Sequence, residues 1–177
     1  MTTQQIAAAM QRVEAFLRRR PEAGLHEDAS ATARWQSGTR VVSSHVNGTL
    51  LSTDMPSELG GSGDKVTPGW LFRAGIASCS ATRIAMSAAA EGIELASLEV
   101  SASSRSDARG LFGMTDAAGE PVCAGPRDVQ LVVRIGAHGV SPERLRSLVE
   151  NSHRCSPVTS AVENAVPMAL HIEVDPA

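Results

Sequence analysis

The first third of the chain changes from a helical pattern to a β-prone one. Apolar residues recur every three or four positions, as one face of a helix requires, at Ile6, Met10, Val13 and Leu17. Pro21 ends this segment. Residues 29–53 then contain three short β-prone runs, ATARWQ, TRVVSSHV and GTLLST, and Asn47-Gly48 between the last two is a strong hairpin signal. We therefore predict an N-terminal helix followed by three strands.

A long helix is predicted in the middle of the chain. Thr67 supplies a capping side chain and Pro68 suits the first helical position, while Gly92 ends the helix after about Glu91. Small residues dominate the segment. Because small side chains let other backbone elements approach closely, we expect this helix to be buried at the centre of the fold.

The remaining pattern completes a mixed fold. Two strands are predicted at 95–104 and 128–135, two helices begin at Ser141-Pro142 and Ser156-Pro157, and a last strand is predicted at 169–174. This order does not alternate strand and helix regularly. It favours an α+β domain over βαβ units.

Composition and charge narrow the class of protein. The chain of 177 residues has 42% hydrophobic residues and a net charge of −3, which indicates a globular domain without a general field for binding nucleic acid or an anionic membrane. Neither a membrane-spanning run nor a secretion signal is recognisable, so we expect a cytoplasmic protein. We predict an N-terminal helix and linker at 1–28 and the main domain at 29–177.

Three cysteines are the candidate chemical groups. Cys79, Cys123 and Cys155 form no Cys-x-x-Cys pair and no dense framework, which argues against a zinc site and a disulfide scaffold. His153 lies two residues before Cys155, but no second pair accompanies it. We predict neither a bound metal nor a cofactor, and expect any special cysteine to be reactive.

Cys79 lies in the middle of the predicted central helix. It belongs to a stripe with helical spacing that contains Phe72, Ile76, Cys79, Arg83 and Met86. Arg83, one turn beyond Cys79, would favour the thiolate if its side chain folded back, because a nearby cation stabilises that form. The alternative is a small buried cysteine that only packs.

Three segments resemble the OsmC/Ohr family, the osmotically inducible and organic hydroperoxide resistance proteins: TPGWLFRAGIASCSAT, EGIELASLEVSASSRSDARG and CSPVTSAV. The resemblance covers about residues 29–174. It implies an OsmC-like intertwined α+β homodimer, with long central helices packed against antiparallel sheets from both chains. It also implies thiol-dependent reduction of hydroperoxides near the dimer interface.

The resemblance assigns roles to two cysteines. Cys79 matches the family's attacking cysteine, which a peroxide oxidises to sulfenic acid. Cys155 is the candidate for the second cysteine, which condenses with that acid to a disulfide, and an external dithiol then regenerates both. Family members commonly read Cys-Pro where this chain has Ser156-Pro157, so Cys155 is displaced by one residue.

Other departures from the family concern the substrate side of the pocket. Active members usually carry Asn-Pro-Glu where this chain has Thr67-Pro68-Gly69, so the carboxylate that would hold a catalytic arginine is missing there. Arg40 is the nearest candidate for that arginine, and Arg34 is another. Trp70 either lines the pocket or packs in the core.

Two functions follow from these residues. The first is a cysteine-based hydroperoxide reductase in oxidative-stress defence, with Cys79, Cys155, Arg40, Arg83 and Trp70 as its site. The second is a non-catalytic OsmC-like protein that binds a small apolar ligand or senses oxidants through Cys79. The missing Glu favours the second, and the position of Cys79 favours the first.

Overall fold

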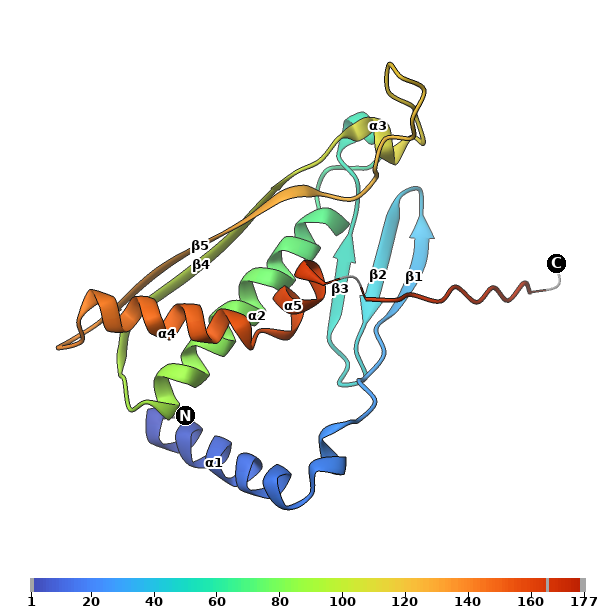
Figure 1. Cartoon of the computed structure of the whole chain (residues 1–177). Coiled ribbons are helices and arrows are strands. Elements are labelled where there is room, and N and C mark those ends of the chain that lie inside the picture. Colours follow the sequence, from blue (N-terminus) through green and yellow to red (C-terminus); the bar gives the residue numbers. More distant parts are fainter. Residues whose placement is uncertain (1, 165, 176–177) are drawn as a thin grey trace.

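The predicted N-terminal helix is confirmed, and it ends before Pro21 as expected. In the computed structural model, which describes residues 2–164 and 166–175, α1 spans Thr3–Arg19 (Figure 1). Thr2 and Gln5 form a capping box, in which each side chain accepts a hydrogen bond from the other's backbone N–H. A short 3-10 helix, η1, follows at Pro21–Gly24. The apolar face of α1 lies against α2.

The three predicted strands form one antiparallel sheet in the order β1-β2-β3. They span Thr32–Ser37, Arg40–Ser44 and Leu50–Thr53. The predicted hairpin at Asn47-Gly48 is confirmed, since β2 and β3 pair across it. Gly48 has a φ of 88°, a left-handed conformation that glycine adopts without steric cost.

The central helix, α2, spans Pro68–Ala90 and is confirmed as the core of the fold. The Thr67 side chain accepts a hydrogen bond from the Trp70 backbone at 3.1 Å, and Pro68 occupies the first turn. Strand β4 and helices α1, α4 and α5 all pack on α2. The buried side chains of α2 are short or β-branched: Ile76, Ser80, Ile84, Ser87, Ala88 and Ala89.

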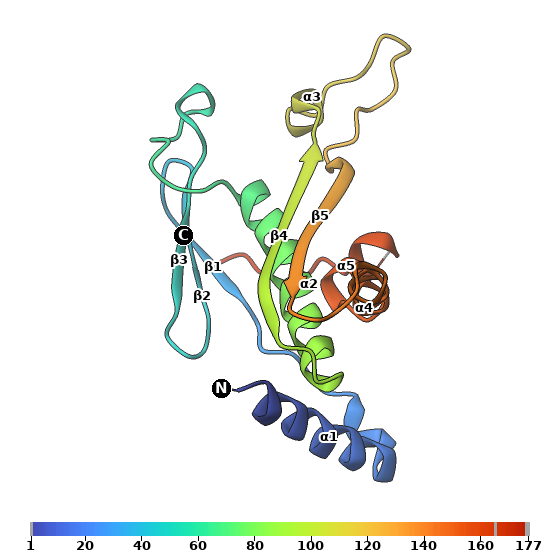
Figure 2. The same cartoon turned by 90° about the vertical axis from the view of Figure 1, so that its left-hand side faces the viewer.

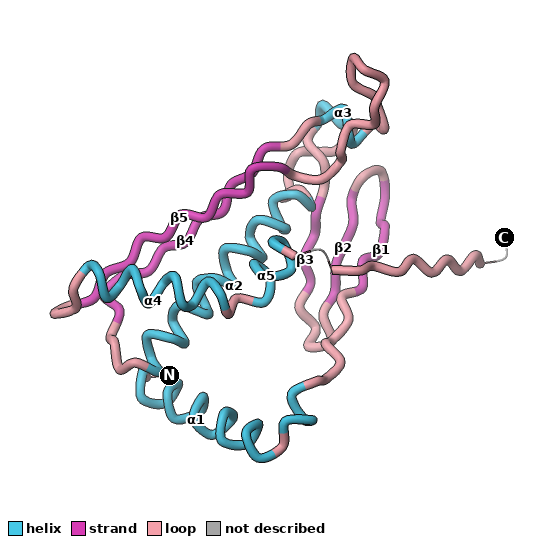
Figure 3. The backbone as a smooth tube through the Cα atoms, in the orientation of Figure 1, coloured by secondary structure: helices cyan, strands magenta, loops and turns pink. Residues whose placement is uncertain are grey.

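A long hairpin runs along α2, as Figures 1 and 3 show. Strand β4 spans Leu95–Arg105 and pairs antiparallel with β5 at Arg127–Ala137. Burial alternates along β4, because one face of the hairpin lies against the helices and the other faces outward. The connection contains a short helix, α3, at Ala108–Leu111, which the sequence pattern does not predict.

Two further helices close the core. Helix α4 spans Pro142–Arg154, with the Ser141 side chain accepting from the Arg144 backbone at 3.2 Å, and α5 spans Pro157–Glu163. Both begin at the predicted Ser-Pro pairs. One apolar cluster joins α2 and α4 to the ends of the hairpin strands: Ala88, Ile93, Leu145 and Leu148, with Leu95, Ile135, Ala137 and Val140 packed against them.

The two sheets stand apart from each other. Figure 2 shows β1–β3 on one side of α2, with the β4–β5 hairpin between that sheet and helices α4 and α5. The chain is thus an α+β fold with antiparallel sheets, as the sequence predicts. Within the described residues, α1, α4 and α5 make their main contacts with α2 and the hairpin, and none makes an extensive contact with β1–β3.

The predicted last strand, 169–174, is not found. Residues 166–175 are extended but pair with no strand in the part of the chain that the structure describes. The alternating apolar side chains Met168, Leu170, Ile172 and Val174 are 94%, 82%, 76% and 85% exposed. Alternating apolar and polar residues give a segment one apolar face, as a strand requires. To form a strand, the segment must also pair with the free edge of a sheet.

The predicted boundary after residue 28 stays a prediction. Helix α1 packs on α2, although it precedes the three-stranded sheet. Among the described residues, no helix has both the length and the apolar composition needed to cross a membrane.

We predict that Leu148→Ala lowers the free energy of unfolding by about 2 to 5 kcal/mol, because Leu148 is 1% exposed at the contact of α4 with α2. Urea unfolding followed by circular dichroism measures the change. Leu25→Ala is the control, since Leu25 is 92% exposed and its truncation leaves no cavity. Equal effects of the two substitutions would contradict the placement of the core.

Candidate active site

Cys79 lies in the middle of α2, partly exposed, with a buried hydroxyl against its sulfur. The Ser156 side chain donates a hydrogen bond to Cys79 Sγ, with Oγ and Sγ 3.4 Å apart. Ser156 is 0% exposed and is the residue just before α5. The turn between α4 and α5 therefore brings a serine, 77 residues away in sequence, into contact with the thiol.

Two more buried hydroxyls extend this contact. Thr159 Oγ1 donates to Ser156 Oγ at 2.9 Å, and Ser80 Oγ lies 3.2 Å from Thr159 Oγ1. Ser80 is 2% and Thr159 6% exposed. We call Ser80, Thr159 and Ser156 the hydroxyl chain. It connects α2 to α5 and back to α2 at Cys79.

Only one arrangement of the hydroxyl protons lets Ser156 donate to the Cys79 sulfur while Thr159 donates to Ser156. Each hydroxyl carries a single proton. If Ser156 donates to Cys79 and Thr159 donates to Ser156, then Ser80 must donate to Thr159. All three O–H dipoles then point the same way, and such chains polarise and strengthen one another. This order suits a negatively charged sulfur, which accepts hydrogen bonds and has no proton to donate.

Cys155 lies next to Ser156 in sequence but is exposed. It caps the C-terminus of α4, with its N–H bonded to the Ser152 carbonyl at 3.1 Å. Ser156, by contrast, is fully buried, and it is the side chain in hydrogen-bond contact with Cys79. The role of Cys155 as second cysteine stays a prediction.

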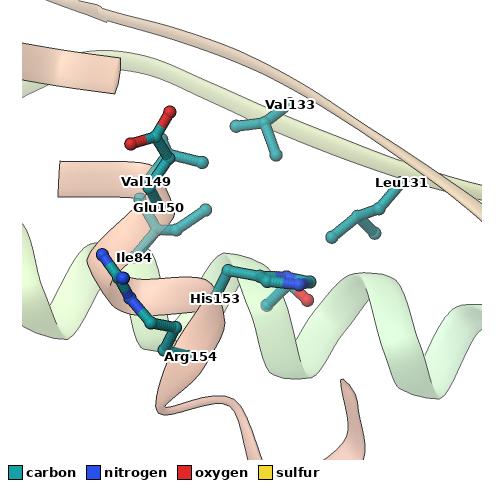
Figure 4. A pocket seen from close by; sticks show the side chains of 8 residues that line it. Ile84, Leu131, Val133, Val149, Glu150, His153 and Arg154 are labelled. Carbon is teal, nitrogen blue, oxygen red and sulfur yellow. The ribbon is translucent and has the colours of Figure 1, made fainter. Parts of the chain in front are cut away.

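A cavity of about 400 Å³ adjoins the hydroxyl chain at Ser80. Helix α4, strand β5 and helix α2 line it (Figure 4). His153 lies in its wall with Nε2 2.9 Å from Glu163 Oε1. Four of its other lining residues are apolar, Ile84, Leu131, Val133 and Val149, and three are polar or charged, Ser80, Glu150 and Arg154. The space suits an apolar group of modest size.

Arg83 and Trp70 lie on α2 but away from this cavity. Arg83 lines a groove between α1 and α2 together with Met86 and Leu17. In the described part of the chain, the hydrogen-bond partner of the Cys79 sulfur is Ser156 and not the Arg83 guanidinium. Trp70 is 47% exposed in the first turn of α2 and is absent from the cavity lining. Their predicted roles toward the substrate remain predictions.

Arg40 is held by acidic and hydroxyl groups at the start of β2. Its Nη2 lies 3.3 Å from Asp54 Oδ2 and 2.6 Å from Ser62 Oγ, and it also pairs with Asp64. These partners belong to the end of β3 and the loop before α2. Among the described residues, Arg40 therefore has its polar partners on this loop, and the structure does not bring it to Cys79 within one chain.

Asp54 is the centre of the Arg40 cluster. It is 3% exposed and accepts hydrogen bonds from Ser62 Oγ at 2.6 Å, Thr39 Oγ1 at 2.6 Å and Met55 N at 2.8 Å. The bonds from Ser62 and Thr39 hold the pKa of the Asp54 carboxyl far below its usual range. Gly61 makes the loop possible, since a Cβ there would collide with the Met55 carbonyl.

The Asp64 carboxyl also has a pKa lowered from its usual value, mainly by the Ser62 hydroxyl and further by Lys65 and Arg40. Two carboxylates thus stay ionised around the Arg40 guanidinium. From the sequence, the arginine is expected to lack its holding carboxylate because Gly69 replaces Glu. For Arg40, Asp54 and Asp64 supply that charge from a different segment.

The sequence matches one protein family over most of this fold. The family described as OsmC-like protein matches residues 61–171, which include α2, the hairpin, α4 and α5. The chain belongs to the OsmC-like protein family. No curated protein matches the sequence.

Solved structures confirm the OsmC-like fold. The organic hydroperoxide resistance protein OsmC of Legionella pneumophila is 22% identical, with 78% of this chain and 90% of that chain covered and a TM-score of 0.56. The OsmC-like protein of Mycoplasma pneumoniae is 13% identical, with 80% and 91% covered and a TM-score of 0.64. An organic hydroperoxide resistance protein of Elizabethkingia anophelis is 20% identical, with 80% and 91% covered and a TM-score of 0.56. At these identities the likeness concerns the fold.

The residues that contact Cys79 are not predicted from the sequence. In the sequence, Ser156 is recognisable only as the residue before a helix and as the replacement of the family's cysteine. Nothing there marks it as a hydrogen-bond donor to Cys79. The signal that could have revealed it is the Ser156-Pro157 pair at the family's Cys-Pro position. No local pattern marks Thr159 or Ser80, because the contact between them joins residues far apart in sequence.

We predict that Asp54→Asn destabilises the fold at pH 7 and that its effect shrinks in acid. A carboxyl with a folded-state pKa below the unfolded value of about 3.9 stabilises the fold above pH 4, and this contribution is lost as the pH falls through the lower, folded-state pKa. Urea unfolding of both proteins at pH 7, 5 and 3 measures the difference. Glu99→Gln on an exposed pair with Arg134 is the control. A difference that grows from pH 5 to pH 3 would refute the assignment.

Proposed function

We propose that the protein reduces organic hydroperoxides through Cys79, in defence against oxidative stress. The observation that carries this proposal is a partly exposed cysteine on the central helix of an OsmC-like fold, with a buried hydroxyl donating to its sulfur. The names of the Legionella and Elizabethkingia proteins, which include hydroperoxide resistance, support the same class of reaction.

The proposed reaction begins with attack of the Cys79 thiolate on one oxygen of the peroxide. The O–O bond breaks, sulfur is oxidised to sulfenic acid, and the other oxygen leaves as an alcohol after taking up a proton. The sulfenic acid then condenses with a thiol, which forms a disulfide and releases water, and an external dithiol reduces that disulfide to restore Cys79 and is itself oxidised to a disulfide. The reaction needs a supply of reduced thiol, and we propose a cytoplasmic location for this reason.

The cavity favours an organic hydroperoxide over hydrogen peroxide. Its apolar walls, with Leu131, Val133 and Val149, would gain from burying an alkyl group, which hydrogen peroxide lacks. The cavity reaches the hydroxyl chain at Ser80, which is linked to Cys79 through Thr159 and Ser156; Cys79 itself is not among the residues that line the cavity.

For polar recognition of the substrate we retain Arg40, Arg83 and Trp70 as proposed substrate-side residues. Arg40 would then have to come from a second copy, since its partners within one chain lie on the 54–64 loop.

We further propose that the protein is a homodimer. The alternating apolar tail at 166–174 is exposed, and the two sheets end in edges that are free among the described residues. An isolated apolar strand and open sheet edges are unfavourable in water, because they leave backbone groups unpaired and apolar side chains exposed. Strand pairing with a second copy would satisfy both.

The dimer predicts a solution mass of twice the 18.5 kDa of the chain. Analytical ultracentrifugation measures it. We expect Leu170→Asp combined with Ile172→Asp to shift the protein toward the single-chain mass, because both side chains lie on one face of the tail and are 82% and 76% exposed in one chain. A wild-type protein of single-chain mass would contradict the dimer, and an unchanged dimer in the double variant would contradict the role of the tail.

Cys79→Ser should reduce the consumption of cumene hydroperoxide, measured with a dithiol reductant, to the rate without protein. Serine keeps the size of the side chain but lacks a nucleophilic sulfur at neutral pH. Cys123→Ser is the matched control, since Cys123 is exposed in the connection of the hairpin, and it should retain wild-type turnover. If wild type and Cys79→Ser consume peroxide equally, Cys79 is not the attacking group.

The cavity itself favours a second candidate, the binding of a small apolar ligand without turnover. This protein would bind an apolar molecule beside Ser80 while Cys79 remained reduced in excess hydroperoxide. Mass spectrometry of the protein after exposure to cumene hydroperoxide separates the candidates, because oxidation of Cys79 is required by the first and not by the second.

A further inference from the structure

We propose that Ser156 is a further catalytic residue of the hydroperoxide reaction: its hydroxyl holds Cys79 as the thiolate, and its presence leaves the oxidised sulfur to be resolved by an external thiol. The inference rests on the proposed function. It differs from the family-based expectation, in which Cys155 resolves Cys79 within the chain.

The contact of Ser156 with sulfur is suited to stabilising a charge. Ser156 Oγ donates to Cys79 Sγ at 3.4 Å, within the range for a hydrogen bond to sulfur. Ser156 is 0% exposed, so bulk water does not compete for its proton. A donor that is buried and fixed before the reaction stabilises a charged sulfur without having to reorganise.

The Ser156 hydroxyl is also held in its donating orientation. Ser156 Oγ accepts the proton of Thr159 at 2.9 Å, and Thr159 lies 3.2 Å from Ser80. Because Thr159 donates to the Ser156 oxygen, the remaining partner for the Ser156 proton is Cys79 Sγ. Every described buried side-chain oxygen and nitrogen has a partner, so the hydroxyl chain is complete as it stands. The packing of α5 on α2 thus fixes a proton donor at the reacting atom.

Ser156 also affects the step after oxidation. A serine hydroxyl cannot form a disulfide, and Ser156 occupies the contact with sulfur that a resolving cysteine would need. Cys155 is exposed, as the cap of α4. An external thiol would therefore attack the Cys79 sulfenic acid, forming a mixed disulfide and releasing water. A second external thiol would then attack the external sulfur of the mixed disulfide. This step restores the Cys79 thiol, and the two external thiols leave as a disulfide.

The first experiment identifies the oxidised species by intact mass and peptide mapping. Wild-type protein is treated with one equivalent of cumene hydroperoxide, then with 2-mercaptoethanol in limited amount. We expect a mixed disulfide between Cys79 and 2-mercaptoethanol. In Ser156→Cys, we expect instead a disulfide between Cys79 and the introduced sulfur, without the adduct, because that sulfur stands at the contact. A Cys79–Cys155 disulfide as the main wild-type product would overturn the proposal.

The second experiment measures the hydrogen bond without any peroxide. The rate of Cys79 alkylation by iodoacetamide is followed against pH in a Cys123→Ser background, with peptide mapping to separate Cys79 from Cys155. We expect Ser156→Ala to move the profile to higher pH and to slow alkylation about tenfold below its midpoint, since a hydrogen bond to a charged group is lost. Thr159→Val should move it in the same direction by less. An unchanged profile in folded Ser156→Ala would overturn the proposal.

The two experiments separate failure of the inference from failure of the proposed function. If Cys79 resists cumene hydroperoxide, the proposed function fails, while the alkylation profile still tests the donor role of Ser156. If Cys79 is oxidised and pairs with Cys155, the function stands and the inference fails. Circular dichroism establishes that Ser156→Ala is folded, and Thr159→Val provides a second readout if it is not.

Discussion

The structure depends on close packing around one helix built of small residues. Because Ser80, Ser87, Ala88 and Ala89 present little volume, β4, α4 and α5 can approach the backbone of α2. The same closeness allows the hydrogen bond from Ser156 to Cys79. A serine on the turn before α5 can touch a sulfur in the middle of α2 only where no larger side chain separates the two helices. The packing on α2 and the contact of Ser156 with Cys79 therefore have one common cause.

Local signals predict most of the elements, and the site is predicted much less well. Capping residues and proline positions set the starts of α2, α4 and α5, and the Asn-Gly pair sets one hairpin, because these features act within a few residues. The contact of Ser156 with Cys79 depends on how α5 packs, which no local pattern encodes. At 169–174 the opposite happens: the local alternation predicts a strand, but in the described chain this segment pairs with no other strand.

Arg40 illustrates why a missing motif residue is a weak guide to a site. Gly69 removes the family's carboxylate from the start of α2, and the sequence alone suggests that an arginine would be unsupported. In the fold, the loop after β3 returns to β2 and supplies Asp54 and Asp64, fixed by Ser62 and by the close turn at Gly61. Arg40 thus has two carboxylate partners on a segment other than the start of α2, and only three-dimensional proximity reveals them.

The exposed apolar tail also bears on how single chains would behave before the proposed homodimer forms. A newly made chain would carry an unpaired, alternating strand beside open sheet edges, the combination that promotes cross-β association between wrong partners. If the proposed homodimer forms, chains that pair quickly would avoid this outcome, whereas a high concentration of unpaired chains would favour it. Solubility during expression would then depend on the rate of correct assembly, and not on the stability of the α2 core.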